Sequence, residues 1–282
     1  FEWPDIGLVV KNAQARIDTP WGVVGAGLNG KGLLRNKFAA DLSLRSPGMA
    51  AVGCLIPAVK FDGNLLLEWR QPHLIGPFSA ANVTCKSSGI AVAAPVFDAD
   101  IRLSERFDKW VGDVGFAAQK LNYADVALSQ PAGEISVDGG LRRTTFVATL
   151  DRTGLRSKPL TVKQLATNAK GYAGFNDGKF AASARGDIRL VGGALDKGTV
   201  GSLRGLVDQT RDTPVGPLLA RMAPALERAG DRFDGALDFD AFRDFQGRSG
   251  AAIDSLALNA ASGARIRQGG ALVLQSSGGG WR

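Results

Sequence analysis

The sequence is poor in the side chains that most enzymes use for catalysis or metal binding. It contains one histidine, two cysteines, two methionines and two tyrosines in 282 residues. The single histidine, His73, excludes a multi-histidine metal site and argues against a histidine-based triad. The carboxylates alternate with Lys and Arg, as cross-strand charge pairs do, and no acid–base pair stands out. We therefore expect no enzymatic activity, no catalytic residues, no metal ligands and no cofactor.

Two kinds of uninterrupted run are also missing. The chain has no run of five or more Lys and Arg residues, and its formal net charge of +7 comes from basic residues interleaved with Asp and Glu. This pattern is typical of a solvated polar face and argues against nucleic acid as a partner. No apolar stretch is long enough to span a bilayer, and no signal peptide is recognisable. Because the chain begins with Phe1, we expect it to be a fragment of a longer protein.

Glycine, in contrast, is abundant, with 37 residues, and hydrophobic residues make up 45% of the chain. The clearest alternation of apolar and polar residues lies at 178–192. Phe180 and Leu190 are at even-numbered positions, and Arg189 is at an odd-numbered one. Such alternation predicts a β-strand with one apolar face. The preceding Asn-Asp-Gly at 176–178 favours a tight reversal and an antiparallel neighbour. Similar alternation recurs along most of the chain without a fixed repeat period, which predicts a mostly β antiparallel meander.

A glycine motif near the N-terminus has an alternative explanation. Gly25, Gly27 and Gly30 match the G-x-G-x-x-G spacing of dinucleotide-binding sites. That motif requires a helix whose N-terminus faces the pyrophosphate, whereas the residues that follow alternate as a strand. We interpret Asn29-Gly30 as a hairpin turn. A dinucleotide-binding enzyme is therefore the least favoured class.

One segment breaks the alternation. It combines N-cap candidates, Asp212 and Thr213, with Pro214 at the first helical position and Gly230 as a natural stop. We predict one Pro-containing amphipathic helix at about 214–229. Its apolar stripe is expected to dock on the sheet and consists of Val215, Leu218, Leu219, Met222 and Leu226.

The two cysteines leave two possibilities open. Cys54 and Cys85 are too far apart in the sequence for a C-x-x-C redox or zinc motif. They are either two free thiols or one disulfide, depending on the compartment.

Together these features resemble the YdbH branch of the AsmA-like envelope proteins of Gram-negative bacteria. The resemblance rests on the glycine-punctuated alternating strands, on the Cys54 and Cys85 pair that flanks a strand region, and on the helical segment from Thr213 to Phe233. It implies a long, curled antiparallel meander that forms an elongated apolar groove. The whole chain is then one groove domain, with a β-meander at 1–200, a helical insertion at 201–234 and further strands at 235–282.

The resemblance also implies a function and a location. Proteins of this family are anchored in the inner membrane, and their periplasmic part carries phospholipid between the two membranes. The expected partners are phospholipid, the inner membrane through an N-terminal anchor outside this chain, and outer-membrane or periplasmic proteins. An oxidising periplasm favours a disulfide between Cys54 and Cys85. Shared parity and the resemblance together predict an acyl-chain path lined by Phe38, Leu42, Leu44, Leu65, Leu67, Phe97, Ile101, Phe116, Phe180, Ile188 and Leu190.

Other classes share the alternating pattern. The strands of an outer-membrane β-barrel also alternate between apolar and polar residues. Such a barrel needs two girdles of aromatic residues, and two Tyr and five Trp residues are few for this purpose. A structural β-rich envelope protein is a further alternative. The pattern alone does not distinguish an open groove from a filled sandwich core.

Overall fold

The computed structural model describes most of the chain, and every regular element within that part is a β-strand. The described residues are 6–51, 53–86, 89–157, 160–176, 179–195, 232–263, 265–277 and 280–281. The predicted mostly β antiparallel class is confirmed. The helix predicted at about 214–229, with its docking residues Val215, Leu218, Leu219, Met222 and Leu226, lies outside the described residues.

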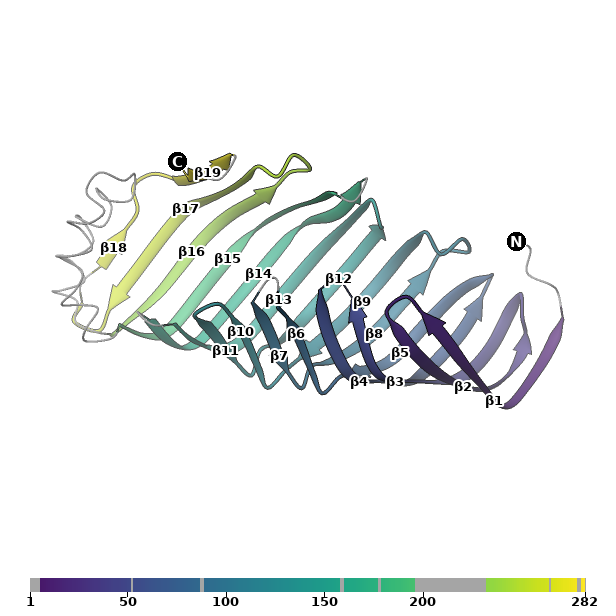
Figure 1. The fold of residues 1–282 in the computed structure, drawn as a ribbon. Coiled ribbons are helices and arrows are strands. Elements are labelled where there is room, and N and C mark those ends of the chain that lie inside the picture. Colours follow the sequence, from purple (N-terminus) through teal and green to yellow (C-terminus); the bar gives the residue numbers. More distant parts are fainter. Residues whose placement is uncertain are drawn as a thin grey trace. The chain divides into compact units, whose positions relative to one another are not determined.

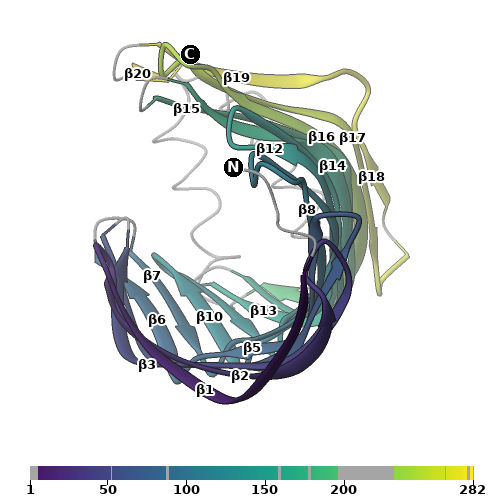
Figure 2. The ribbon, with the colours of Figure 1, turned by 90° about the vertical axis from the view of Figure 1, so that its right-hand side faces the viewer.

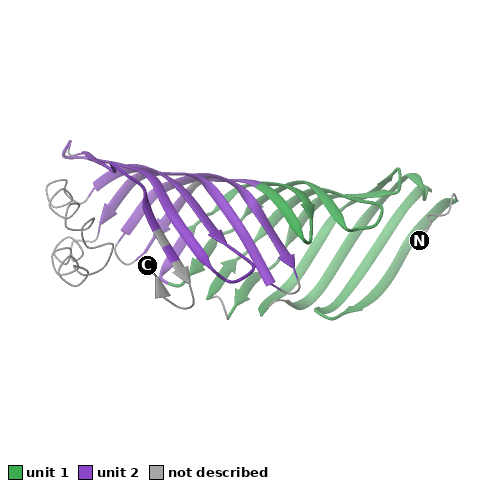
Figure 3. Ribbon diagram, turned by 90° about the horizontal axis from the view of Figure 1, so that it is seen from above, with its two compact units in different colours: residues 1–124, 129–146 green, residues 125–128, 147–282 purple. Residues whose placement is uncertain are grey.

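Within the described residues, most strands follow one another along the chain with short connections (Figure 1). They are β1 (Gly7–Thr19), β2 (Gly22–Leu33), β3 (Asn36–Ala51), β4 (Cys54–Glu68), β5 (Gln71–Ser79), β6 (Asn82–Cys85), β7 (Ile90–Ala93), β8 (Val96–Leu103), β9 (Lys109–Ala117), β10 (Lys120–Tyr123), β11 (Val126–Ser129), β12 (Ala132–Gly140), β13 (Arg143–Arg156), β14 (Leu160–Asn176), β15 (Lys179–Leu195), β16 (Arg232–Arg243), β17 (Ser249–Ala260), β18 (Arg265–Arg267), β19 (Leu272–Ser277) and β20 (Gly280–Trp281). The chain divides into two compact units (Figure 3), namely unit 1 (1–124 and 129–146) and unit 2 (125–128 and 147–282).

Unit 1 is an antiparallel meander. Strands β1, β2, β3, β4, β5, β8, β9 and β12 pair in that order. The short strands β6, β7 and β10 extend it, because β6 pairs with β4 and β7, and β7 pairs with β10. Strands that are adjacent in sequence are thus mostly adjacent in space, as expected when tight turns join alternating segments.

The interpretation of Asn29-Gly30 as a hairpin turn is wrong. Both residues lie within β2, and the turn between β2 and β3 is at Leu34 and Arg35. A Cβ atom on Gly30 would lie 2.3 Å from the Cβ of Ala40 on the neighbouring strand. Glycine is therefore placed here by the close approach of two strands rather than by a chain reversal.

A line of residues bends the strands of unit 1. Ala58, Ala94 and Gln130 have positive φ values of 53°, 47° and 50°. The Ala94 amide donates a hydrogen bond to the Ala81 carbonyl, and the Gln130 amide to the Gln119 carbonyl, both at 3.0 Å. We call these five residues the crease. Left-handed residues change the strand direction while the ladder continues across them, and Figure 2 shows β6, β7 and β10 on a wall of unit 1 that turns away from β8.

The crease explains why the alternation is unclear between Met49 and Val59. On one side of it, Val59 and Phe61 of β4 are buried, at 4% and 5% exposure. On the other side the parity is shifted, since Leu55 is exposed and Ile56 is half-buried. A single left-handed residue therefore moves the apolar pattern from odd to even positions within one strand.

Unit 2 contains a second antiparallel meander. Strand β14 pairs with β15, β15 with β16, and β16 with β17, which in turn pairs with β18 and β19. Strand β20 pairs with β19. Asn176 is paired with Lys179, so the neighbours predicted from the Asn-Asp-Gly signal are confirmed. A register shift between Leu190 and Gly193 bends β15 near its end.

The best-packed cluster lies in unit 1. Phe38, Ala40 and Leu67 are 3%, 5% and 4% exposed, and the half-buried residues packed against them are Leu8, Val10, Leu28, Leu34 and Leu65. Removal of a large side chain from this cluster leaves a cavity whose lining atoms lose their contacts. The cluster should therefore contribute strongly to the stability of unit 1.

The first prediction tests this cluster. We expect Phe38→Ala to lower the free energy of unfolding by about 3 kcal/mol, because a buried ring is replaced by a cavity. The matched variant Phe107→Ala removes a ring that is 54% exposed in a turn, and should cost less than half as much. Urea unfolding followed by circular dichroism measures both values. Equal losses would show that Phe38 is not part of a packed core.

Candidate functional site

A row of phenylalanines crosses unit 1 on one face of the sheet. Phe61 is paired with Phe78, Phe78 with Phe97, and Phe97 with Phe116, each on the neighbouring strand. Directly opposed residues point to the same face of a sheet. The ring centroids of Phe61 and Phe78 are 6.4 Å apart. Leu44 extends the row on β3, because it is the partner of Phe61.

The remaining predicted lining residues of unit 1 lie on this same face. Phe38 is paired with Leu67, and Ala40 with Leu65. Ile101 lies four residues after Phe97 on β8 and therefore shares its side. The register thus joins eight predicted residues, which we call the apolar face of unit 1: Phe38, Leu42, Leu44, Leu65, Leu67, Phe97, Ile101 and Phe116.

Burial varies along the apolar face of unit 1. Phe38 and Leu67 are almost completely buried, whereas Phe97 is 39% exposed. The other five residues of the face are half-buried. Side chains of a filled core are close-packed on all sides. The partly exposed residues therefore leave apolar surface that a ligand can cover.

The three predicted lining residues of unit 2 also share a face. Phe180, Ile188 and Leu190 alternate along β15. Phe180 is paired with Phe175 of β14, with ring centroids 5.1 Å apart, and is 41% exposed. Ile188 is paired with Leu237 of β16. These five residues form the apolar face of unit 2.

Charged side chains occupy the opposite side of the same strands. In unit 2, Arg189 Nε lies 3.5 Å from Asp187 Oδ2. In unit 1, Arg45 Nη2 lies 2.5 Å from Asp62 Oδ1. Exposed pairs of this kind contribute little to stability. Their main effect is to keep one side of each sheet hydrated while the other side stays apolar.

Three further residues, which were not predicted, belong to the apolar face of unit 1. Phe61 and Phe78 belong to the phenylalanine row, and Leu74 is paired with both Leu65 and Ile101. Phe61 alternates with Leu65, so parity alone was a sufficient signal. Leu74 and Phe78 lie among the prolines and glycine of β5, which obscure the alternation.

A disulfide lies beyond the crease in unit 1. Cys54 of β4 is directly opposite Cys85 of β6, and a disulfide joins them across a sequence separation of 31 residues. Cys85 is 7% exposed. This is the pairing that the sequence analysis favoured, and it ties the short strand β6 to the long strand β4.

A buried histidine pairs with a carboxylate on the polar side of unit 1. His73 is 6% exposed, with its Nε2 atom 2.5 Å from Asp100 Oδ1. Within the described ranges, no three His, Cys, Asp or Glu side chains are arranged to hold a metal ion. Gly25, Gly27 and Gly30 lie inside β2, so they do not open onto the helix N-terminus that a pyrophosphate site uses.

Two aspartates with altered acidity belong to hairpin turns. Ser104 Oγ donates a hydrogen bond to Asp108 Oδ1 at 2.7 Å, which is the main cause of the lowered pKa of Asp108. Desolvation by itself raises the pKa of Asp244, but the hydrogen bonds from Arg248 and Gln246 and the positive charge of Arg248 together outweigh it, and the pKa is lowered. Each carboxylate stabilises its turn above the unfolded-state pKa, and this contribution is lost as the pH falls through the folded-state value. Both residues serve the turns rather than the apolar faces.

Comparisons with known proteins return no relative. No protein-family model, curated protein or solved structure matches this chain. In the part of the chain that the structure describes, no helix is both long and apolar enough to cross a membrane. The fold and the site define the class of the protein as β-rich, with apolar sheet faces. The geometry of those faces is the basis for a proposal about function.

The second prediction concerns the disulfide. Reduction should lower the free energy of unfolding by about 3–4 kcal/mol, because the bond closes a loop of this length in the unfolded chain. Urea unfolding with and without reductant measures the difference. In the double variant Cys54→Ser and Cys85→Ser, reductant should have no effect. Two titratable thiols in non-reduced, denatured protein made in an oxidising compartment would contradict the pairing.

Proposed function

We propose that this chain is a periplasmic segment of a lipid-transfer protein that shields phospholipid acyl chains between the inner and outer membranes of a Gram-negative bacterium. The observation that carries this proposal is the apolar face of unit 1, where one phenylalanine from each of four neighbouring strands stands in a single row. The apolar face of unit 2 adds paired apolar residues on β14, β15 and β16, namely Phe175 with Phe180 and Ile188 with Leu237.

The energetics of lipid transfer require such a surface. Each acyl methylene that leaves a membrane for water costs about 0.8 kcal/mol. A protein that covers the chains with apolar side chains removes most of this cost and needs no nucleophile or metal. Phe97 and Phe180, at 39% and 41% exposure, have apolar area available for such contacts.

The opposite face and the disulfide fit the same role. The charged side of each sheet, with pairs such as Arg189 and Asp187, suits contact with water while the apolar side covers lipid. A disulfide between Cys54 and Cys85 is typical of proteins in an oxidising compartment such as the periplasm. Anchoring in the inner membrane would come from a segment outside this chain.

The third prediction tests lipid contact directly. A photo-crosslinking amino acid at Phe97 should capture phospholipid in cells, because this side chain is partly exposed on the apolar face. The same amino acid at Asp98, the next residue of β8, should not, because neighbouring residues of a strand point to opposite faces. Leu190 and Arg189 form the equivalent pair in unit 2. Mass spectrometry of the crosslinked lipid measures the outcome, and equal labelling within both pairs would remove the basis for the proposal.

The fourth prediction separates lipid shielding from a purely structural role. Ile188→Asp should reduce lipid capture at Leu190 several-fold, because a carboxylate on the apolar face must stay hydrated or protonate. The milder variant Ile188→Thr should retain more capture. The melting transition of each variant shows whether it is folded. A folded Ile188→Asp variant with undiminished capture would count against an acyl-chain path along this face.

A further inference from the structure

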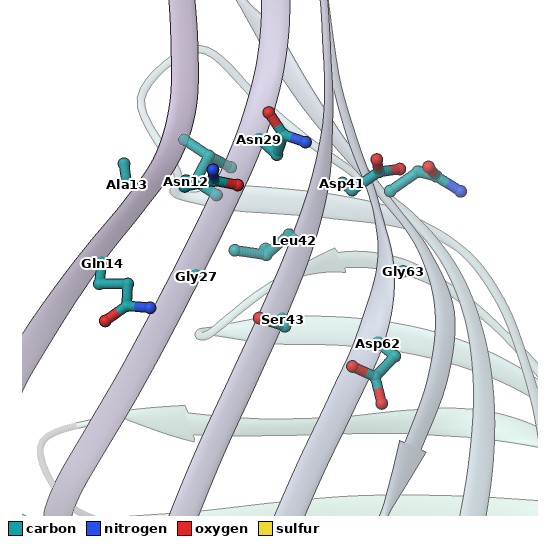
Figure 4. Close-up of a pocket in the computed structure, with 12 residues that line it drawn as sticks. Asn12, Ala13, Gln14, Gly27, Asn29, Asp41, Leu42, Ser43, Asp62 and Gly63 are labelled. Carbon is teal, nitrogen blue, oxygen red and sulfur yellow. The ribbon is translucent and has the colours of Figure 1, made fainter.

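A hollow on the polar face of unit 1 shares only Leu42 with the proposed lipid path. It lies over β1 to β4 and has a volume of about 520 Å³ (Figure 4). We call it the polar hollow. Its lining residues are Asn12, Ala13, Gln14, Gly27, Leu28, Asn29, Asp41, Leu42, Ser43, Asp62, Gly63 and Asn64. This volume falls in the range of small-molecule sites.

The register shows which side of the sheet the polar hollow opens on. Asn29 is paired with Asp41, and Asp41 with Asn64, so their side chains form one wall. Ser43 and its partner Asp62 belong to a parallel wall two residues further along the strands. Both walls have the parity opposite to the apolar face of unit 1. The hollow is therefore a trough between two rows of polar side chains.

Most polar groups of the hollow are neutral hydrogen-bonding groups, and Ala13, Leu28 and Leu42 make up the apolar part of its lining. The amides of Asn12, Gln14, Asn29 and Asn64 each offer donors and acceptors, and the Ser43 hydroxyl offers both. The charge of Asp62 is balanced by Arg45, which lies 2.5 Å away. The Asp41 carboxylate adds acceptors and disfavours an anionic ligand.

Two backbone features shape the trough. Gly27 leaves a gap in the second wall, and a Cβ atom there would lie 2.6 Å from Ser43 Oγ. Asn12 has a left-handed φ of 49° at a register irregularity of β1 between Val10 and Ala13. Figure 4 shows Asn12, Asn29 and Asp41 on neighbouring strands along one side of the hollow.

We propose that the polar hollow binds a neutral saccharide. Vicinal sugar hydroxyls donate to carboxylate and amide oxygens and accept from amide N–H groups, which are the groups that line both walls. An elongated trough suits two or three linked sugar rings laid across the strands. The site lies on the opposite side of the sheet from the lipid path, so it does not depend on lipid transfer.

The fifth prediction tests this site with defined probes. Isothermal titration calorimetry of the full chain with maltotriose, cellotriose and chitotriose should give saturable binding for at least one of them. Asn29→Ala and Asp41→Ala should each weaken that binding about tenfold. Each substitution removes hydrogen bonds to the ligand that no other group of the protein replaces.

A matched control separates this site from general effects. Asn168 is also an exposed asparagine in a strand, but it lies in unit 2 and bonds to Asp187. Asn168→Ala should leave the affinity within about twofold of the parent chain, and circular dichroism should show all three variants folded. Absence of saturable binding to all three probes would overturn the proposal. Binding that survives unchanged in folded Asn29→Ala and Asp41→Ala would overturn it equally.

Discussion

The hydrogen-bonded register between neighbouring strands is the constraint on which both faces of this protein depend. Side chains alternate along a strand, so a slip of one residue would move every apolar side chain to the hydrated side. The pairing of β4, β5, β8 and β9 places Phe61, Phe78, Phe97 and Phe116 side by side. A continuous apolar surface therefore follows from the backbone pairing of strands whose apolar residues share one parity.

The crease lets this surface change direction without losing the ladder. Ala58, Ala94 and Gln130 each adopt a left-handed conformation, yet the strands on both sides stay paired. At the crease, the apolar side chains change from odd-numbered to even-numbered positions along β4. Beyond it, the half-buried residues Val83 of β6 and Val92 of β7, which are paired, continue the apolar side. The disulfide then holds β6 against β4. Bending, apolar continuity and covalent restraint are thus combined within a few residues of one another.

The two proposed ligands would bind to opposite faces of β1 to β4. Leu42 belongs to the apolar face of unit 1 and also lines the polar hollow, and its neighbours Asp41 and Ser43 lie in the two polar rows of that hollow. A single-layered sheet can have one apolar face and one polar face, because each side chain of a strand points to only one side of the sheet. Acyl chains require apolar contact area and tolerate little polarity, while a saccharide requires satisfied hydrogen bonds. The two proposals are accordingly independent, and each face can be altered by substitutions that do not touch the other.

The sequence by itself determined the mostly β class, the pairing of β14 with β15, and the parity that puts Phe38 with Leu42 and Ile188 with Leu190, because a period of two is a local property. Only the tertiary structure decided which strands are neighbours, and hence that Phe61, Phe78 and Leu74 join the apolar face. It also moved the turn from Asn29-Gly30 to Leu34 and Arg35 and placed the crease at Ala58. In the sequence, a glycine at a close approach between strands looks the same as a glycine in a turn, and a left-handed alanine has no signature in residue type.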